Sequence, residues 1–322
     1  MIVLILSFLV FVPLQIASLP LAVLGFIIVA YRQVVVSKRL GVSQSGIEVL
    51  NGRWTMHVFG MRHDVATARL AAALPNTSTL GLWLVLFPLW VKYKIGGVNF
   101  AYPRVASEGS EDARDLVTSR TLYVDRIVRR VIGDVDQFVV LGAGYDTRAY
   151  GETRREGLVS FELDQDSTQR LKVASLEAAG IDAAHVTFVP VDFRYEDAFE
   201  KLRAAGYDPR KKTLFLWEGV TLYLAEKHVR KTLRAVREHS PPGSIVVADI
   251  YGERFLQVGG RVARKTLDYT GEALSFGLPF ATEHEEELRR FLESEHVTQG
   301  ETYFMGRTSK KGPFGVVAEL GV

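Results

Sequence analysis

The first 31 residues of the chain carry no charged side chain, and the first charge is Arg32. A bilayer core of about 30 Å is crossed by about 20 helical residues, so a run of this length can cross once but not twice. Lys38 and Arg39 add further positive charge after the run, which favours the cytoplasm for the rest of the chain. We therefore predict a transmembrane or membrane-inserted helix over residues 1–31, contact with membrane lipids, and a body on the cytoplasmic side.

Two other interpretations of this uncharged run stay open. A cleaved signal peptide usually starts with a positively charged segment and has a shorter apolar stretch, and the run has neither property. A helix buried inside a soluble protein could be just as apolar. Pro13 and Pro20 would bend the helix, which membrane helices tolerate when neighbouring helices satisfy the freed carbonyl groups.

The remaining residues have the composition of an ordinary folded protein. The chain has 322 residues, and its 39 Lys and Arg nearly balance its 37 Asp and Glu. Nucleic acid binding depends on clustered cations, so we expect no nucleic acid partner. The chain has no Cys, and its 7 His residues are scattered, so we expect no metal site. His284 with the acidic run 283–287 is typical of the polar first turn of a helix.

Residues 32–111 form a membrane-proximal region in this interpretation. Two short alternating runs flank Asn51-Gly52 within residues 46–62, and this pattern indicates a β-hairpin. Residues 64–74 then have the pattern of a short amphipathic helix.

The apolar stretch 80–91 is the second membrane candidate of this region. It contains Trp83, Trp90 and Pro88, and cations flank it on both sides. These features favour an interfacial helix at the level of the lipid headgroups. A core helix packed against the body is the alternative that the sequence leaves open.

From residue 112 to residue 322 short apolar segments alternate with amphipathic ones. This alternation predicts an α/β domain with a mostly parallel sheet and helices on both faces. Ligands of such sheets bind beyond the carboxyl ends of the strands. The predicted elements are a helix at 112–132, strands at 138–141, 158–163, 186–190, 213–217 and 244–248, and helices at 166–178 and 226–239.

Candidate ligand-binding residues follow three of the predicted strands. Gly142 and Gly144 follow the first, where glycine lets the backbone approach a ligand. Thr147 stands where the dinucleotide fingerprint has its third glycine, which disfavours a nicotinamide cofactor. Asp164 follows the second strand at the place where a carboxylate can accept both ribose hydroxyls. Asp192-Phe193 follow the third strand and suit the amine and ring of an adenine.

Five segments stand in a distinctive order: SRTLYVD (119–125), VVLGAGYDTR (139–148), FELD (161–164), VDFR (191–194) and WEGVTLYL (217–224). On these segments the chain resembles the S-adenosylmethionine-dependent methyltransferases of the leucine carboxyl methyltransferase family. The resemblance implies a class I methyltransferase (Rossmann-like) fold with a seven-stranded sheet, and S-adenosyl-L-methionine as cofactor. The N-terminal third departs from the usual pattern of this family.

The resemblance also implies a cofactor-binding role for individual residues. Arg120 would pair with the carboxylate of the cofactor, because a guanidinium grips a carboxylate with two hydrogen bonds. The other cofactor-binding residues would be Gly142, Ala143, Gly144 and Asp146 at the methionine part, Asp164 at the ribose, Asp192 and Phe193 at the adenine, and Glu218 at the ammonium group.

Glu218 and Tyr223 are the residues that the resemblance assigns to catalysis. Glu218 would face the methyl-transfer region and orient the acceptor, and Tyr223 would contact the acceptor. Two structural alternatives remain. Arg120 could instead form an ion pair with Asp125 or Glu111, and we expect Arg148 to pair with Glu162 or another acid at a strand end.

The chemistry of the acceptor stays open at this stage. The methyl group of a sulfonium is already activated, so the protein has to align the reacting atoms and exclude water. A carboxylate acceptor needs no base, whereas a hydroxyl acceptor does, and Glu218, His228 and His284 are the candidates. Of these, His228 is expected at a helix surface.

A glycine-punctuated aromatic segment at 251–282 follows the fifth strand, where a substrate lid would lie. Together with the apolar N-terminus, it favours a small-molecule or lipid-like methyl acceptor that arrives from the membrane. We predict a membrane-anchored O-methyltransferase that acts on a carboxylate or hydroxyl of a lipid-like or prenylated acceptor. The alternatives are a protein C-terminal carboxyl methyltransferase and a non-catalytic protein of the same fold.

Overall fold

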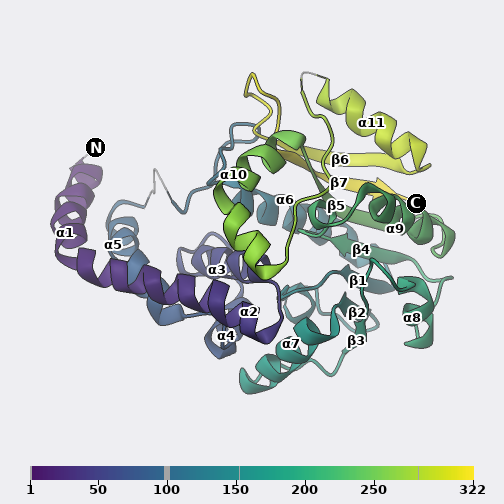
Figure 1. Cartoon of the computed structure of the whole chain (residues 1–322), viewed down its shortest axis with the longest axis horizontal. Coiled ribbons are helices and arrows are strands. Elements are labelled where there is room, and N and C mark those ends of the chain that lie inside the picture. Colours follow the sequence, from purple (N-terminus) through teal and green to yellow (C-terminus); the bar gives the residue numbers. More distant parts are fainter. Residues whose placement is uncertain (1, 98–101, 152, 282) are drawn as a thin grey trace.

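The computed structural model describes residues 2–97, 102–151, 153–281 and 283–322. It shows an α/β body and a helical N-terminal arm that extends from one side of the body (Figure 1). Met1, the first residue of the predicted membrane helix, and Thr282, the last residue of the predicted lid segment, lie outside the described residues. Residues 98–101 of the predicted membrane-proximal region also lie outside them.

A single seven-stranded sheet forms the centre of the body, as the resemblance implied. Its strand order is β3-β2-β1-β4-β5-β7-β6, with β1 to β5 parallel and β7 antiparallel to both of its neighbours. The strand order reverses beside β1, which pairs with β2 and β4, and a crevice opens there. The strands are β1 (Gln137–Leu141), β2 (Val159–Asp164), β3 (Val186–Pro190), β4 (Thr213–Trp217), β5 (Ile245–Tyr251), β6 (Thr298–Met305) and β7 (Gly315–Gly321).

All five strands predicted from the sequence are present, and helices cover both faces of the sheet (Figure 1). Side chains of β1 alternate between two cores, with Phe138 and Val140 on one face and Val139 and Leu141 on the other. The body helices are α6 (Leu116–Val131), α7 (Asp166–Ala178), α8 (Ala198–Ala204), α9 (Glu226–Glu238), α10 (Glu253–Thr270) and α11 (His284–Ser294). The acidic run therefore opens α11 as predicted.

The segment 251–282 is largely helical. Tyr251 ends β5, and α10 occupies residues 253–270. The chain then returns to the body, where the backbone N–H of Ser275 donates to the carbonyl of Leu222 at 2.7 Å. The prediction that this segment acts as a lid remains a prediction.

The predicted hairpin at residues 46–62 is wrong, because α3 (Gln44–Val58) occupies most of this segment. Ser43 caps the helix by accepting a hydrogen bond from the backbone N–H of Gly46 at 3.1 Å. Ile47, Leu50 and Trp54 recur at helical spacing and are all buried. Burial of this face outweighs the turn preference of the Asn-Gly pair.

The other helices of the N-terminal region are α1 (Ile2–Ala30), α2 (Ser37–Leu40), α4 (Val65–Ala73) and α5 (Thr79–Gly96). A π-helical turn, Tyr31–Val36, joins α1 to α2. Helix α4 confirms the predicted amphipathic helix. Helix α1 bends sharply (Figure 1) and contains Pro13 and Pro20, which are common causes of a helix kink.

Helices α1 and α5 form a close antiparallel pair through small residues. A Cβ added to Gly25 would lie 2.6 Å from the carbonyl oxygen of Gly81, and one added to Gly96 would lie 2.8 Å from Ser7 Oγ. The opposite side of α5 reaches α3, since the Trp54 and Trp83 ring centroids are 5.6 Å apart. Helix α5 is therefore a layer between α1 and the body.

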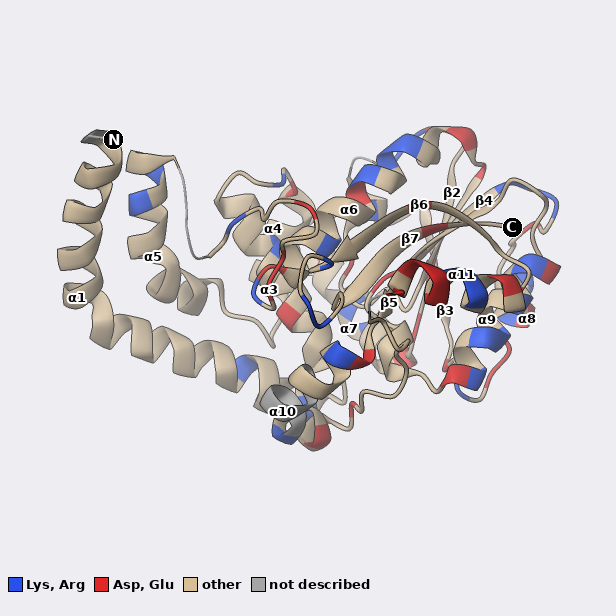
Figure 2. Cartoon of the chain, turned by 90° about the horizontal axis from the view of Figure 1, so that it is seen from above, with Lys and Arg blue, Asp and Glu red and all other residues tan. Residues whose placement is uncertain are grey.

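The outer face of α1 is apolar and exposed. Among the described residues, the helix Val3–Leu40 is the one candidate that is long and apolar enough to cross a membrane, and only 6% of its most apolar window is buried. Charged side chains gather on the body and are nearly missing from the arm (Figure 2). A core helix of a soluble domain would be mostly buried, and α1 is not.

Candidate functional site

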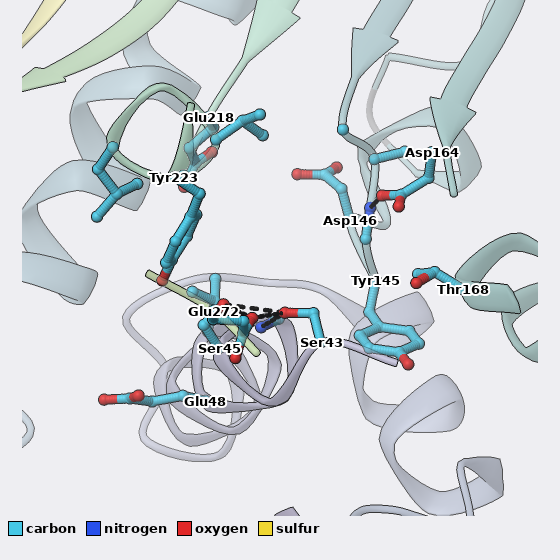
Figure 3. A pocket seen from close by; sticks show the side chains of 18 of the residues that line it. Ser43, Ser45, Glu48, Tyr145, Asp146, Asp164, Thr168, Glu218, Tyr223 and Glu272 are labelled. Atoms are coloured by element: carbon cyan, nitrogen blue, oxygen red, sulfur yellow. Dashed lines mark hydrogen bonds between the residues drawn. The ribbon is translucent and has the colours of Figure 1, made fainter. Parts of the chain in front are cut away.

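A cavity of about 570 Å³ opens at the carboxyl ends of β1, β2 and β4. Helix α3 and the loop after α10 close its other side. Figure 3 shows Glu218 and Tyr223 on one wall, Asp146 and Asp164 on another, and Ser43, Ser45 and Glu272 facing them. The cavity therefore lies where the sheet topology predicted a ligand site.

The loop after β1 shapes one wall with two glycines. Gly142 and Gly144 have φ of +70° and +44°, which side chains other than glycine rarely adopt. A Cβ on Gly142 would collide with Val220, whereas a Cβ on Gly144 would meet nothing within 4 Å. Gly144 lines the cavity together with Ala143, so its missing side chain leaves room for a ligand.

Asp164 is fixed beside this loop by two backbone donors. Its carboxylate accepts hydrogen bonds from the N–H groups of Gly144 at 2.6 Å and Gln165 at 2.7 Å. Burial raises the pKa of Asp164, while these two hydrogen bonds act in the opposite direction. An acceptor held in this way is suited to a pair of ribose hydroxyls.

Asp192 and Phe193 also line the cavity. Asp192 forms an ion pair with Arg194 at 2.6 Å, and a hydrogen bond from that side chain is the main cause that lowers its pKa. The predicted adenine contact of these residues stays a prediction.

Glu218 lies at the centre of a buried charge network. Its carboxylate accepts hydrogen bonds from Arg120 at 3.0 Å, Arg53 at 2.8 Å and Arg148 at 2.7 Å. Burial by itself would raise the pKa of Glu218, but the three arginines, Arg148 first, lower it to about 2. Glu218 is therefore a poor proton acceptor near neutral pH and a strong fixed anion.

The network continues on both sides of Glu218. Asp146 accepts from Arg53 at 2.7 Å and from Arg148 at 2.5 Å. Burial opposes the ionisation of Asp146, but Arg148 and Arg53 outweigh it and lower its pKa. Arg120 also donates to Asp249 at 3.2 Å and to the Tyr251 hydroxyl at 2.5 Å.

The structure shows which ion pairs Arg120 and Arg148 form. Arg120 pairs with neither Asp125 nor Glu111 but lines the cavity beside Glu218. Arg148 pairs with Asp146 and Glu218, which are acids at strand ends as expected, and also with Asp125, but not with Glu162. Glu162 instead forms a buried ion pair with Lys172 at 2.6 Å.

Tyr223 ends the short 3₁₀ turn Thr221–Tyr223 and lines the cavity as predicted. Its hydroxyl points toward Ser45 and Glu272 (Figure 3). The two histidine base candidates, His228 and His284, are absent from the described lining. His284 packs against Phe304, with ring centroids 4.6 Å apart. His228 lies on α9 and is half-buried.

Sequence reasoning missed the contribution of α3 and of the loop after α10. The missed lining residues are Ser43, Ser45, Glu48, Arg53 and Glu272. Treating residues 46–62 as a hairpin hid two of them, Glu48 and Arg53. The signal that could have found them is the Ser43 cap followed by apolar residues at helical spacing.

The residues fit the cofactor that the resemblance implied. Guanidinium groups and carboxylates alternate in the buried network, so it can offer partners to charges of either sign. S-adenosylmethionine carries a sulfonium, an ammonium and a carboxylate, and hence one net positive charge. The open space at Gly144 and the fixed acceptor Asp164 add the shape and the hydrogen bonds that its methionine and ribose parts need.

Comparisons with known proteins agree with this assignment. The family model of leucine carboxyl methyltransferase matches residues 82–237, which is just under half of the chain. The chain is 32% identical to a protein of Mycobacteroides abscessus over 50% of this chain and 53% of the relative. It is 31% identical to YktD of Bacillus subtilis over 44% of this chain and 47% of the relative. Both relatives carry the provisional name of an S-adenosyl-L-methionine-dependent methyltransferase.

The chain spans about half the length of these two relatives. Among solved structures, a protein from Thermobifida fusca, provisionally described as a methyltransferase, aligns with a TM-score of 0.50 and 17% identity. The alignment covers 79% of this chain and 93% of that protein, and it supports the class I methyltransferase fold.

Proposed function

We propose that the chain is an S-adenosylmethionine-dependent O-methyltransferase that acts on a hydrophobic acceptor at a membrane. The observation that carries the enzyme assignment is the cavity in which Gly144, Asp164 and the Arg120–Glu218 pair come together at the strand ends. The names of the matched relatives support the same reaction class.

Each residue of this site has a task in the proposed reaction. The cofactor supplies an activated methyl group. Asp164 accepts the ribose hydroxyls, and Arg120 offers a guanidinium to the carboxylate of the cofactor. Glu218, held by three arginines, provides a fixed negative charge near the cationic part of the cofactor.

Calorimetric titration with S-adenosylhomocysteine tests the cofactor assignment. We expect micromolar binding to the wild type, and a loss of at least about tenfold in Asp164→Ala, because a carboxylate with two ligand hydrogen bonds is removed. Asp166→Ala is the matched control. Asp166 lies two residues after Asp164, but it is exposed and forms an ion pair with Arg170. Absence of binding to the wild type, or equal binding by all three proteins, would contradict the assignment.

The membrane part of the proposal rests on α1. Its outer side carries large apolar side chains, among them Leu9 and Ile16 with 66% and 69% of their surface exposed. Exposed apolar areas of this kind mark membrane or protein contacts. Because the inner side of α1 packs on α5, we propose that the outer side contacts the bilayer and that Arg32, Lys38 and Arg39 keep the body on the cytoplasmic side.

Flotation with vesicles of phosphatidylglycerol and phosphatidylethanolamine tests this contact. The double variant Leu9→Arg, Ile16→Arg should remain folded, since both side chains are exposed, and should lose most vesicle binding. Tyr195→Arg is the control, because Tyr195 is 80% exposed on the body. Equal flotation of the double variant and the wild type would remove the membrane from the proposal.

The match to the leucine carboxyl methyltransferase model favours a second candidate, a protein C-terminal carboxyl methyltransferase. Methyl transfer from labelled cofactor into a membrane fraction separates the two candidates. Label in extracted lipid supports the first, whereas label confined to protein supports the second.

A further inference from the structure

The end of the cavity near α3 differs in charge from the end near Glu218. Glu272 accepts hydrogen bonds from the hydroxyl groups of Ser43 at 2.5 Å and Ser45 at 2.7 Å, and Tyr223 points at the same cluster (Figure 3). These donors are neutral, and within the described part of the chain Glu272 forms no ion pair. Lys38 also lines the cavity but forms no ion pair with Glu272, so no described cation is paired directly with this carboxylate.

Glu48 adds a second carboxylate to this end. It lies one helical turn beyond Ser45 on α3, so both side chains face the cavity from the same side of the helix. Its side chain makes neither an ion pair nor a hydrogen bond with any residue that the structure describes. A carboxylate in this condition is free to accept a proton from a bound molecule.

The surroundings of Glu48 favour its protonated form more than water does. The titratable groups that face it are Arg120 of α6, Glu272, Tyr223 and Tyr102. Burial raises the pKa of Glu48, Arg120 opposes this shift, and Glu272 reinforces it. The best proton acceptors have a pKa close to the working pH, so this direction suits a base.

We propose that the methyl acceptor is a hydroxyl group and that Glu48 is the catalytic residue that takes its proton. This inference rests on the proposed function and narrows it. A carboxylate acceptor would bring a third negative charge next to Glu48 and Glu272, and like charges at short range repel each other. A neutral hydroxyl avoids this repulsion and needs the base that Glu48 provides.

Apolar side chains in the cavity could contact the apolar part of the acceptor. Leu116, Val117 and Phe255 are among the residues that line the cavity. In the proposed step the acceptor oxygen forms a bond to the methyl carbon while the bond from that carbon to the sulfonium sulfur breaks. The bonding pair stays on sulfur, the hydroxyl proton passes to Glu48, and solvent that enters the open cavity later removes that proton.

The stability of the methylated product to alkali shows whether the acceptor is a hydroxyl or a carboxylate. The test works for any lipid that carries the acceptor group. The wild type is incubated with S-adenosylmethionine labelled in the methyl group and with total membrane lipid, and the labelled lipid is treated with mild alkali. A methyl ether, the expected product, keeps its label. Release of the label as methanol would identify a methyl ester and overturn the proposal.

Glu48→Gln tests the role of the carboxylate. We expect the transfer rate to fall about 100-fold or more, which is within the range that a positioned base contributes. The rate of the wild type should rise with pH as Glu48 ionises, and this limb should vanish in the variant. Glu226→Gln, an exposed position on α9, is the control. A variant with the wild-type rate and pH profile would overturn the proposal.

A binding measurement tests the charge argument even if transfer is slow. With S-adenosylhomocysteine bound, 4-dodecylphenol should bind the wild type at pH 8 at least about tenfold more tightly than 4-dodecylbenzoate, because only the benzoate is an anion. In Glu48→Gln the difference in affinity between the phenol and the benzoate should be smaller than in the wild type. Equal affinities for the wild type would contradict the inference. Loss of S-adenosylhomocysteine binding itself would instead contradict the proposed function.

Discussion

The acidic side chains at the two ends of the cavity differ in their ion pairing. Near the strand ends, Glu218 and Asp146 are buried and each pairs with at least two arginines. Near α3, Glu272 has only hydroxyl donors and Glu48 has no partner among the described residues. In our proposal the first end holds the charged cofactor in one orientation, and the second end exchanges a proton with the acceptor.

The largest expected effect comes from breaking the paired end. Arg148→Gln removes the partner that Asp125, Asp146 and Glu218 share, and removing one partner of a buried ion pair typically costs about 3–5 kcal/mol. Urea unfolding should show this loss. Arg210→Gln is the control, because its pair with Asp208 is exposed and its loss should not be measurable. The comparison fails if the two variants are equally stable.

The pH dependence of stability sharpens the same contrast. Glu218 has a folded-state pKa of about 2, below its unfolded value, so its ionised form stabilises the fold above the unfolded pKa. That contribution should disappear as the pH falls from about 5 toward 2. Unfolding free energies measured from pH 7 to pH 3 should therefore fall more steeply for the wild type than for Glu218→Gln. Parallel curves would show that the arginines do not hold the pKa of Glu218 down.

Gly144→Ala probes the wall of the paired end. Alanine at φ of +44° costs about 1–2 kcal/mol, and its methyl group would project into the cavity. The Gly144→Ala variant should therefore have a lower affinity for S-adenosylhomocysteine than the wild type. Gly180→Ala is the matched control, since Gly180 has φ of +62° and open space but does not line the cavity. It should lose similar stability and keep its affinity, and equal affinities in both variants would count against the cofactor position.

The smallest effect is expected at the unpaired end. Ser45→Ala removes one hydrogen bond to Glu272, which is worth about 1 kcal/mol or less to stability. Thermal unfolding should change little, and affinity for S-adenosylhomocysteine should not change. A loss as large as that of Arg148→Gln would mean that this end is also built for stability.

Much of the body could be predicted from the sequence, because strand and helix periodicity are local properties. The loop after β1 and Asp164 were found for the same reason, since each lies just after a strand, whereas Tyr223 was found through the family resemblance. The buried ion pairs could not be predicted in this way. Arg53 and Asp146 are 93 residues apart, and only the fold decides that they meet.

The hairpin prediction failed for a related reason. Asn51-Gly52 is a strong local turn signal, but Gly52 in α3 is where the helix approaches α6, and a Cβ there would lie 2.8 Å from Val117. Tertiary packing thus overrode a local preference. The error also removed Glu48 and Arg53 from the predicted site, so the acidic end of the cavity became visible only with the fold.

The central claim is that the cavity is divided into a cofactor end and an acceptor end. One calorimetric series with S-adenosylhomocysteine tests it directly, on the wild type, Asp164→Asn and Glu48→Gln. The account predicts an affinity loss of about tenfold or more for Asp164→Asn and an affinity within about twofold of the wild type for Glu48→Gln. A loss in Glu48→Gln as large as that in Asp164→Asn would contradict the division of the cavity.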